Sequence, residues 1–162
     1  MKFGLTGDTH NNLKNIKIIC DIFNNEDINF VIHTGDITLP KSLEAFNKLK
    51  MPLKGVFGNN DQEEKESLSL VCNKYGFEFD DGPKKLSHDG RDIYIVHDPL
   101  DIEDYFYGRN NIIVHGHTHR FRDEQIHDTY IFNPGECAGM MNGKNNIGIV
   151  DLFKNSMRIV NF

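Results

Sequence analysis

The first half of the chain alternates short apolar runs with segments of helical periodicity. Apolar runs predict strands over residues 2–6, 29–33 and 53–57. Apolar residues three or four positions apart predict three helices. The first runs from Leu13 to Phe23 and is capped by Asn11 or Asn12, the second has Pro40 in its first turn, and the third ends at Gly76. Such strand-helix alternation is typical of a parallel sheet.

The second half is richer in strands that are joined by turns. Turn signals at Gly82-Pro83, Asp89-Gly90 and Lys154-Asn155 separate apolar runs at hairpin distances. We predict strands over residues 77–80, 84–87, 92–96, 112–115, 129–132, 146–152 and 157–162. We therefore expect an α/β fold, a layered α/β/β/α sandwich of two packed mixed sheets flanked by helices. With no internal repeat or linker, residues 1–162 are expected to form a single domain.

Composition narrows the class of protein. Hydrophobic residues make up 38% and charged residues 26%, as in ordinary globular chains. The longest apolar runs are strand-sized and the N-terminus lacks a signal-peptide pattern, so we expect a cytoplasmic protein without a membrane partner. A net charge of -6 argues against an extended nucleic-acid-binding surface. The sequence leaves open whether the chain forms a homo-oligomer.

The three cysteines indicate neither a disulfide framework nor a zinc ribbon, because they are odd in number and far apart. Cys20 and Cys72 fall on apolar helical faces and are expected to pack in the core. Cys137 follows Glu136, with nothing evident in the sequence to stabilise a thiolate. A cysteine hydrolase is therefore unsupported.

Polar residues collect directly after five of the predicted strands. In chain order these are Asp8 and His10, Asp36, Asn59, His97, and finally His117 with His119. The carboxyl ends of parallel strands open on one crevice, so we expect these side chains to lie together.

Each of these polar residues alone has an ordinary explanation, such as a turn, a helix cap or a hydrogen-bonded histidine. Seven donors after five strands instead favour a metal site. Nitrogen and oxygen donors without a thiolate suit Mn²⁺, Fe²⁺, Ni²⁺, Co²⁺ or Zn²⁺ better than Ca²⁺. Seven ligands exceed the needs of one tetrahedral ion but suit two ions if Asp36 bridges them with its two oxygens.

The ordered series Asp-x-His, Gly-Asp, Gly-Asn, a lone His and Gly-His-x-His, within residues 1 to about 136, resembles the calcineurin-like metallophosphoesterases, specifically the small YfcE-like phosphodiesterase branch. The resemblance implies one ion on Asp8, His10, Asp36 and His119, and a second on Asp36, Asn59, His97 and His117. It favours Mn²⁺ or Ni²⁺ and implies a small-molecule or nucleotide-derived phosphodiester substrate. We predict that a hydroxide bridging the two ions attacks the phosphate ester.

Two positions depart from the family pattern. Many relatives carry a histidine after the Gly-Asn asparagine, proposed to protonate the leaving oxygen, whereas this chain has Asn60, which cannot act as a general acid. Asp98 replaces a glycine that often follows the lone histidine, and it either orients His97 or faces solvent.

The sequence gives less support for placing other polar residues in the metal site. We expect His33 and His115 to pack within strands, and His88 and His127 to lie in loops or at the surface. Arg120 and Arg122 either contact substrate phosphate or are simply exposed charges.

Two alternatives to an enzyme remain. The first is a protein-binding scaffold on the same fold, as in the retromer subunit Vps29, but a scaffold has no chemical need for a complete ligand set. The second is a nucleotide-binding switch, which lacks support because no phosphate-binding Gly-x-x-x-x-Gly-Lys-Ser/Thr loop occurs. The sequence does not select the substrate or the native cation.

Overall fold

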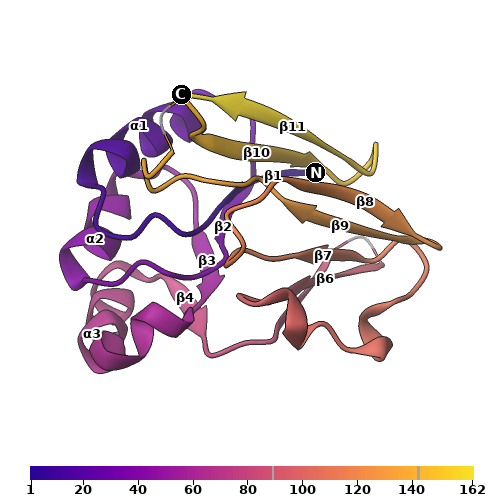
Figure 1. Cartoon of the computed structure of the whole chain (residues 1–162), viewed down its shortest axis with the longest axis horizontal. Coiled ribbons are helices and arrows are strands. Elements are labelled where there is room, and N and C mark those ends of the chain that lie inside the picture. The colour runs from indigo at the N-terminus through magenta and orange to yellow at the C-terminus, as the bar shows by residue number, and fades with distance from the viewer. Residues whose placement is uncertain (89, 142) are drawn as a thin grey trace.

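The first of two mixed β-sheets has six strands, four of which run parallel (Figure 1). The computed structural model describes residues 1–88, 90–141 and 143–162. Within the first sheet the spatial order is β11 (Ser156–Asn161), β10 (Asn146–Asp151), β1 (Lys2–Thr6), β2 (Phe30–His33), β3 (Leu53–Val56) and β4 (Glu78–Asp80). Strands β10 and β11 add to it in antiparallel fashion.

Three α-helices connect the parallel strands, as the periodicity predicts. They are α1 (Leu13–Asn24), α2 (Pro40–Ala45) and α3 (Lys65–Tyr75). Asn12 caps α1 by accepting the Asn15 N–H, and Gly76 ends α3 in the left-handed conformation with φ 71°. The second predicted helix is shorter than expected, because the chain tightens into a 3₁₀ turn, η1 (Phe46–Lys48), after Ala45.

The second sheet has five strands in the order β5 (Lys84–His88), β6 (Arg91–Ile95), β7 (Ile112–Val114), β9 (Thr129–Asn133) and β8 (Arg122–Ile126). Strands β6, β7 and β9 are parallel, and β5 and β8 are antiparallel edge strands. Strand β8 was not predicted, because its sequence Arg-Asp-Glu-Gln-Ile has no apolar alternation, which a largely exposed edge strand does not need. The predicted turn at Asp89-Gly90 includes residue 89, which lies outside the described residues.

The two sheets pack face to face, and α1, α2 and α3 cover the outer face of the first sheet (Figure 1). Phe3, Leu5 and Ile32 of the first sheet meet Ile95, Val114 and Phe132 of the second in a buried layer. The outer face of the second sheet packs on the segment that carries two 3₁₀ turns, η3 (Pro99–Asp101) and η4 (Asp104–Phe106). The layered fold is thus confirmed, with short 3₁₀ turns forming its fourth layer.

Two smaller expectations have different outcomes. Cys20 and Cys72 are buried in the core between the helices and the first sheet, as predicted. His88 was assigned to a loop or to the surface, which is wrong: it ends β5 and stacks on Phe30 at 5.2 Å between ring centroids.

No helix among the described residues has the length and apolarity needed to cross a bilayer.

The layer between the sheets is expected to carry much of the stability. Replacing buried Phe132 by Ala removes a ring that is 0% exposed and should lower the free energy of unfolding by about 3–5 kcal/mol. Phe153→Ala is the matched control, because that ring is 87% exposed and its loss should cost less than about 0.5 kcal/mol. Urea denaturation followed by circular dichroism measures both. Equal effects of the two substitutions would contradict the assignment of this core.

Candidate metal centre

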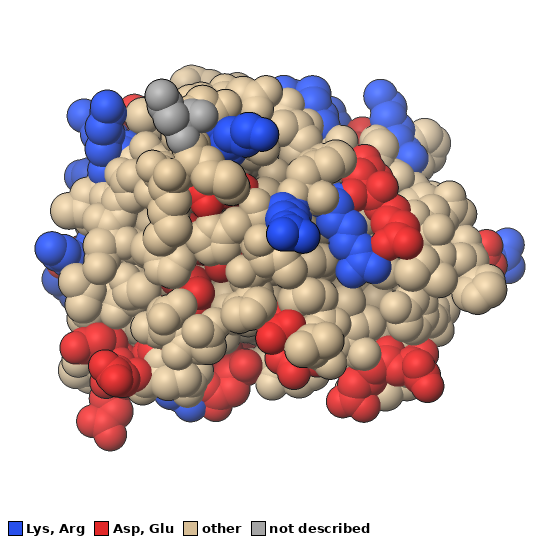
Figure 2. Space-filling model, in the orientation of Figure 1, with Lys and Arg blue, Asp and Glu red and all other residues tan. Residues whose placement is uncertain are grey.

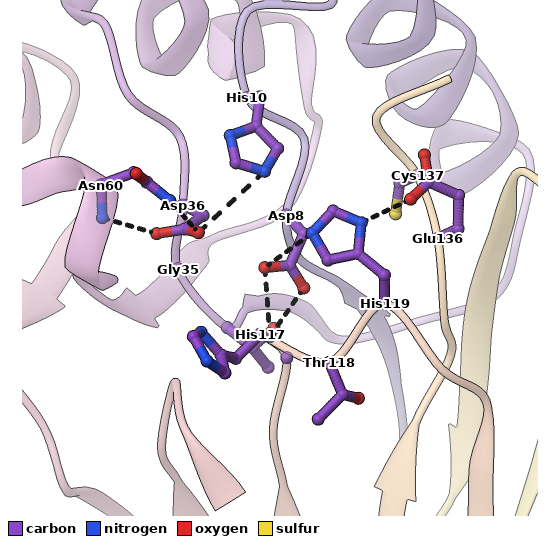
Figure 3. Close-up of polar contacts among 12 residues, drawn as sticks. Asp8, His10, Gly35, Asp36, Asn60, His117, Thr118, His119, Glu136 and Cys137 are labelled. Carbon is purple, nitrogen blue, oxygen red and sulfur yellow. Dashed lines mark hydrogen bonds and ion pairs between the residues drawn. The ribbon is translucent and has the colours of Figure 1, made fainter. Parts of the chain in front are cut away.

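The polar side chains meet at one edge of the two packed sheets, where β1, β2, β3, β6 and β7 end. Main-chain hydrogen bonds join the loops that follow these strands, among them Asp8 N to Gly35 O at 2.8 Å and Gly116 N to His97 O at 3.0 Å. All seven residues that sequence analysis selected come from these loops, and the contacts below bring them into one cluster. Figure 3 shows five of them, Asp8, His10, Asp36, His117 and His119.

One part of the cluster consists of Asp8, His10 and His119, which offer donor atoms within 4.8 Å of one another. His119 Nε2 lies 3.8 Å from Asp8 Oδ1, and the rings of His10 and His119 stack at 5.6 Å. His10 Nε2 points toward Asp36 Oδ2 at 4.0 Å, beyond hydrogen-bond distance (Figure 3).

His10 Nε2 is buried and has no hydrogen-bond partner among the described residues. Buried polar atoms in native structures nearly always have a partner, so an unpaired imidazole nitrogen aimed at the Asp36 carboxylate indicates a ligand for a cation. The donor chemistry and this orphaned atom both fit a divalent metal ion.

The other part of the cluster contains Asp36, Asn59, His97 and His117. His97 Nε2 lies 2.9 Å from Asn59 Oδ1 and 3.4 Å from Asp36 Oδ1, and His117 Nδ1 lies 3.1 Å from Asn59 Oδ1. Asp8, Asp36 and His97 also place donor atoms within 4.8 Å of one another. The two parts are therefore continuous, with Asp8 and Asp36 between them.

The loops that carry these residues have unusual backbone conformations. Five of the selected residues have positive φ values, which non-glycine residues adopt rarely; they are Asp8, His10, Asp36, His117 and His119, with φ between 44° and 64°. Such conformations persist only where the surroundings impose them, and they cluster at functional sites.

Glycines next to the cluster leave room for its carboxylates. A Cβ built on Gly116 would lie 2.6 Å from Asp8 Oδ2, and one on Gly58 would overlap Asp36 Oδ1. The glycines of the Gly-Asn and Gly-His motifs are thus required by close approach, which the sequence pattern alone does not reveal.

Asp61 holds the Asp36 loop in place. Its carboxylate accepts backbone N–H groups from Asp36, Ile37, Thr38 and Gly58 at 2.6 to 2.9 Å, and the side chain is fully buried. This one side chain therefore joins the loop after β2 to the loop after β3. Sequence analysis did not select Asp61, because its partners are backbone groups that leave no pattern in the sequence.

Asn60 contacts the same carboxylate from the other side. Its backbone N–H donates to Asp36 Oδ1 at 2.9 Å, and its side-chain amide donates to Oδ2 at 2.7 Å (Figure 3). Both bonds favour the ionised form of Asp36.

Glu136 was not selected from the sequence, although it belongs to the same neighbourhood. Its Oε2 accepts a hydrogen bond from His119 Nδ1 at 2.5 Å (Figure 3). Its Oε1 accepts the Met140 N–H at 2.8 Å. A glycine and an acidic residue follow β9 after one proline, in Pro134-Gly135-Glu136, much as Gly7-Asp8 follows β1. This repeated order is the signal that could have identified it.

Burial and mutual charge set the protonation of the cluster. Burial raises the pKa of Asp8 to about 6 and lowers the pKa of His10. Burial also opposes the charged forms of Asp36 and His97, but their mutual attraction outweighs it. The pKa of Asp36 therefore lies well below its usual range, and the pKa of His97 is raised to about 9.

A family model described as the calcineurin-like phosphoesterase superfamily domain matches residues 1–155. The chain belongs to this superfamily. The resemblance seen in the sequence is thereby confirmed, and the Asp/His clusters are of the kind that dinuclear metallophosphoesterases use to bind metal.

Several individual phosphoesterases are similar to this chain. Phosphodiesterase MJ0936 of Methanocaldococcus jannaschii is 32% identical over 167 residues, covering 98% of this chain and 97% of the relative. The solved structure of an archaeal phosphodiesterase is similar with a TM-score of 0.85 at 28% identity, covering 100% of both chains. YfcE from E. coli shares the fold, with a TM-score of 0.74 at 20% identity and coverage of 99% and 98%.

The Vps29 fold that the scaffold alternative invokes is also similar. Vps29 from Entamoeba histolytica aligns with a TM-score of 0.65 at 16% identity, covering 100% of this chain and 99% of that one. Identity this low shows a common fold and nothing about a common function.

The structure places Asp98 in neither of the two roles that the sequence left open, which were to orient His97 or to face solvent. Asp98 lies 3.6 Å from His117 Nε2 and caps η3 by accepting the Leu100 N–H. Asp98 thus contacts His117, whereas His97 is oriented by a hydrogen bond from Nδ1 to Thr34 O at 2.9 Å.

The two arginines differ in their surroundings. Arg122 pairs with Glu124 at 2.6 Å and lies 3.5 Å from His115 Nε2, so this surface network holds it. Arg120 is exposed beside His119.

His33 and His115 are buried, as expected, and Cys137, for which no burial was predicted, is buried as well. His33 bonds to Thr9 Oγ1 at 2.9 Å on β2, and His115 follows β7. Cys137 is enclosed, and burial raises the pKa of its thiol to about 12, which removes the basis for a thiolate nucleophile.

The Asp61 network leads to a stability prediction. Asp61→Ala leaves four backbone N–H groups without their acceptor and should lower the free energy of unfolding by roughly 2–4 kcal/mol. Glu63→Ala is the matched control on the same 3₁₀ helix, η2 (Asn59–Glu64), because Glu63 is exposed. Thermal and urea unfolding measure both variants, and an Asp61 variant as stable as the control would refute this role.

Proposed function

We propose that this phosphoesterase hydrolyses phosphodiesters with two divalent cations held at the cluster described above. The observation that carries the proposal is the convergence of seven oxygen and nitrogen donors from the loops after five strands, one of which, the buried His10 Nε2, has no hydrogen-bond partner among the residues that the structure describes. The diester specificity rests on the relative MJ0936, a phosphodiesterase that aligns over nearly the whole chain. A scaffold has no chemical need for such a donor set.

We assign one cation to Asp8, His10, Asp36 and His119, and the other to Asp36, Asn59, His97 and His117. Mixed imidazole and oxygen donors suit Mn²⁺ or Ni²⁺, with Fe²⁺, Co²⁺ and Zn²⁺ as competitors. Such cations, when bound, act as Lewis acids that lower the pKa of water and neutralise charge on a phosphate ester.

The surrounding residues prepare the imidazoles for this role. His97 donates from Nδ1 to Thr34 O, and His119 donates from Nδ1 to Glu136. Each bond leaves Nε2 directed at the carboxylates Asp36 and Asp8, respectively. Fixing the tautomer in this way orients the ring and raises its basicity as a ligand. Because the pKa of His97 is raised, its Nε2 would have to give up a proton before it could serve as a ligand to a cation.

Asn60 has a positioning role in this proposal. It fixes both oxygens of Asp36, so that this carboxylate presents a constant geometry to two cations. Its amide carries no titratable proton, and it supplies no general acid for the leaving oxygen. We therefore expect phosphodiesters with good leaving groups to be the better substrates.

The metal requirement is tested by chelation and restoration. Protein stripped with chelator should not hydrolyse bis(p-nitrophenyl) phosphate, and Mn²⁺ or Ni²⁺ should restore turnover. Asp36→Ala and Asn59→Ala should each lower kcat/KM by about a hundredfold or more, because both remove donors that hold the cations. The p-nitrophenyl monoester should be the poorer substrate.

Glu63→Ala serves as the control for these assays, because it changes an exposed carboxylate near Asn59 without touching the cluster. No turnover with any of Mn²⁺, Ni²⁺, Fe²⁺, Co²⁺ or Zn²⁺, or an Asp36 variant as active as the Glu63 variant, would refute the enzyme. A preference for the monoester would refute only the diester assignment.

Glu136 provides a separate test of how His119 is positioned. Glu136→Ala should weaken Mn²⁺ binding by roughly 10–100-fold, because the His119 ring loses the partner of its Nδ1. Glu136→Gln keeps a hydrogen-bond acceptor and should lose less. Calorimetric titration of Mn²⁺ measures the affinity, and kcat at saturating Mn²⁺ should change much less than the affinity does.

The control is the exposed Glu103, changed to Ala and to Gln, which should bind Mn²⁺ like the unaltered protein. Unchanged Mn²⁺ affinity in Glu136→Ala would show that this carboxylate has no part in positioning His119.

A further inference from the structure

Two pockets of opposite charge lie on either side of the candidate metal centre. The first, about 260 Å³, has Asn59, His97 and His117 in its wall and is lined by three carboxylates, Asp81, Asp98 and Asp101. The second, about 410 Å³, has His119 in its wall; we call it the Phe121 pocket, after a lining that includes Arg120, Phe121, Met141, Lys144 and Asn146. The metal-ligand candidates therefore separate an acidic pocket from a basic one.

The positive charge of the Phe121 pocket is available to a ligand. Neither Arg120 nor Lys144 forms an ion pair with any residue that the structure describes. Glu136 also reaches this pocket, but it is 2% exposed and its two oxygens are engaged by His119 and the Met140 N–H. Two unpaired cations thus lie next to a candidate metal ligand.

The same pocket presents apolar surface. The Phe121 ring is 55% exposed and Met141 is 44% exposed, although large apolar side chains usually lie inside a protein. An exposed ring beside an arginine offers a stacking surface for a planar aromatic group. The pocket therefore combines the two features that recognise an aromatic group with negative charge.

The charge asymmetry extends beyond the pockets. Figure 2 shows Asp and Glu crowding the lower edge of this face, on the side of α3 and the η3 and η4 turns, whereas Lys and Arg predominate on its upper half. A polyanion that extended across both sides would meet the carboxylates of the acidic pocket. The site thus favours a short ester with its negative charge on one side.

We propose that the Phe121 pocket is a substrate subsite for a nucleotide-like group, with its planar ring on Phe121 and Met141 and its additional negative charge at Arg120 and Lys144. This inference rests on the proposed function, because it assigns the phosphodiester to the metal centre and one of its two substituents to this pocket. The other substituent, neutral or cationic, faces the acidic pocket. The substrate class is then an asymmetric nucleotide ester.

Binding of three phosphate compounds to the Mn²⁺-loaded full chain tests the subsite by calorimetry at low ionic strength. Adenosine 5′-monophosphate should bind roughly tenfold more tightly than ribose 5-phosphate, because only the former has a ring to stack. Adenosine 3′,5′-bisphosphate should bind more tightly again, by about threefold to tenfold, because its second phosphate reaches the two cations.

Each preference should depend on its own side chains. Phe121→Ala should remove the preference for the monophosphate over ribose 5-phosphate, and Arg120→Ala combined with Lys144→Ala should remove the added preference for the bisphosphate. The matched controls are Phe153→Ala and Lys154→Ala, which lie in the turn between β10 and β11, at the opposite edge of the sheet from the metal centre. Both controls should keep both preferences.

Turnover of bis(p-nitrophenyl) phosphate, measured on the same samples, separates the two proposals. Turnover without any preference for the ring, or a ring preference that survives Phe121→Ala, overturns the subsite and leaves the phosphodiesterase standing. A Phe121-dependent preference in a protein without turnover overturns the phosphodiesterase and leaves the ring-binding site standing.

Discussion

Two buried carboxylates, Asp8 and Asp36, share one small space where the two sheets meet, and much of the local structure serves to hold them there. Like charges in a buried position repel each other and lose their hydration, so the arrangement is costly without compensation. Compensation comes from His97 and His119, from the Asn60 amide and from the His117 N–H. A divalent cation bound by these residues would add the positive charge that the neighbouring groups supply only in part.

The backbone conformation around the two carboxylates also helps to hold them in place. The loops after β1, β2 and β7 adopt left-handed conformations at five of the candidate ligands. These conformations cost conformational energy and are typical of functional sites. Asp61 joins the loop after β2 to the loop after β3 by accepting four backbone N–H groups, and glycines remove the Cβ atoms that would occupy the space of the carboxylates. The rigid sheets beneath fix where each loop begins. Preorganisation of this kind lets ligands meet a cation without a large rearrangement.

Outside this rigid centre the surface is more open and differs on its two sides. His117 and Asp98 line the acidic pocket, whereas His119 leads into the basic Phe121 pocket, so two histidines two positions apart in the sequence face opposite electrostatic environments. Superfamily membership fixes the chemistry of the centre, but selectivity depends on these flanking side chains. The charge pattern is therefore the feature of this chain that bears most directly on its substrate.

The repeating strand-helix order, the layered fold and the seven candidate donors could be predicted from the sequence, because periodic burial and polar residues after strand ends are local patterns that a linear chain displays. The sequence did not show β8, since an exposed edge strand needs no apolar alternation, nor Asp61, since that side chain binds backbone groups. Glu136 had a local signal, a glycine and an acidic residue after a strand, but its partner His119 lies 17 positions away. Only the tertiary structure brought such distant residues into contact and gave the two pockets their opposite charges, because both depend on how separate loops pack rather than on the order of residues in any one of them.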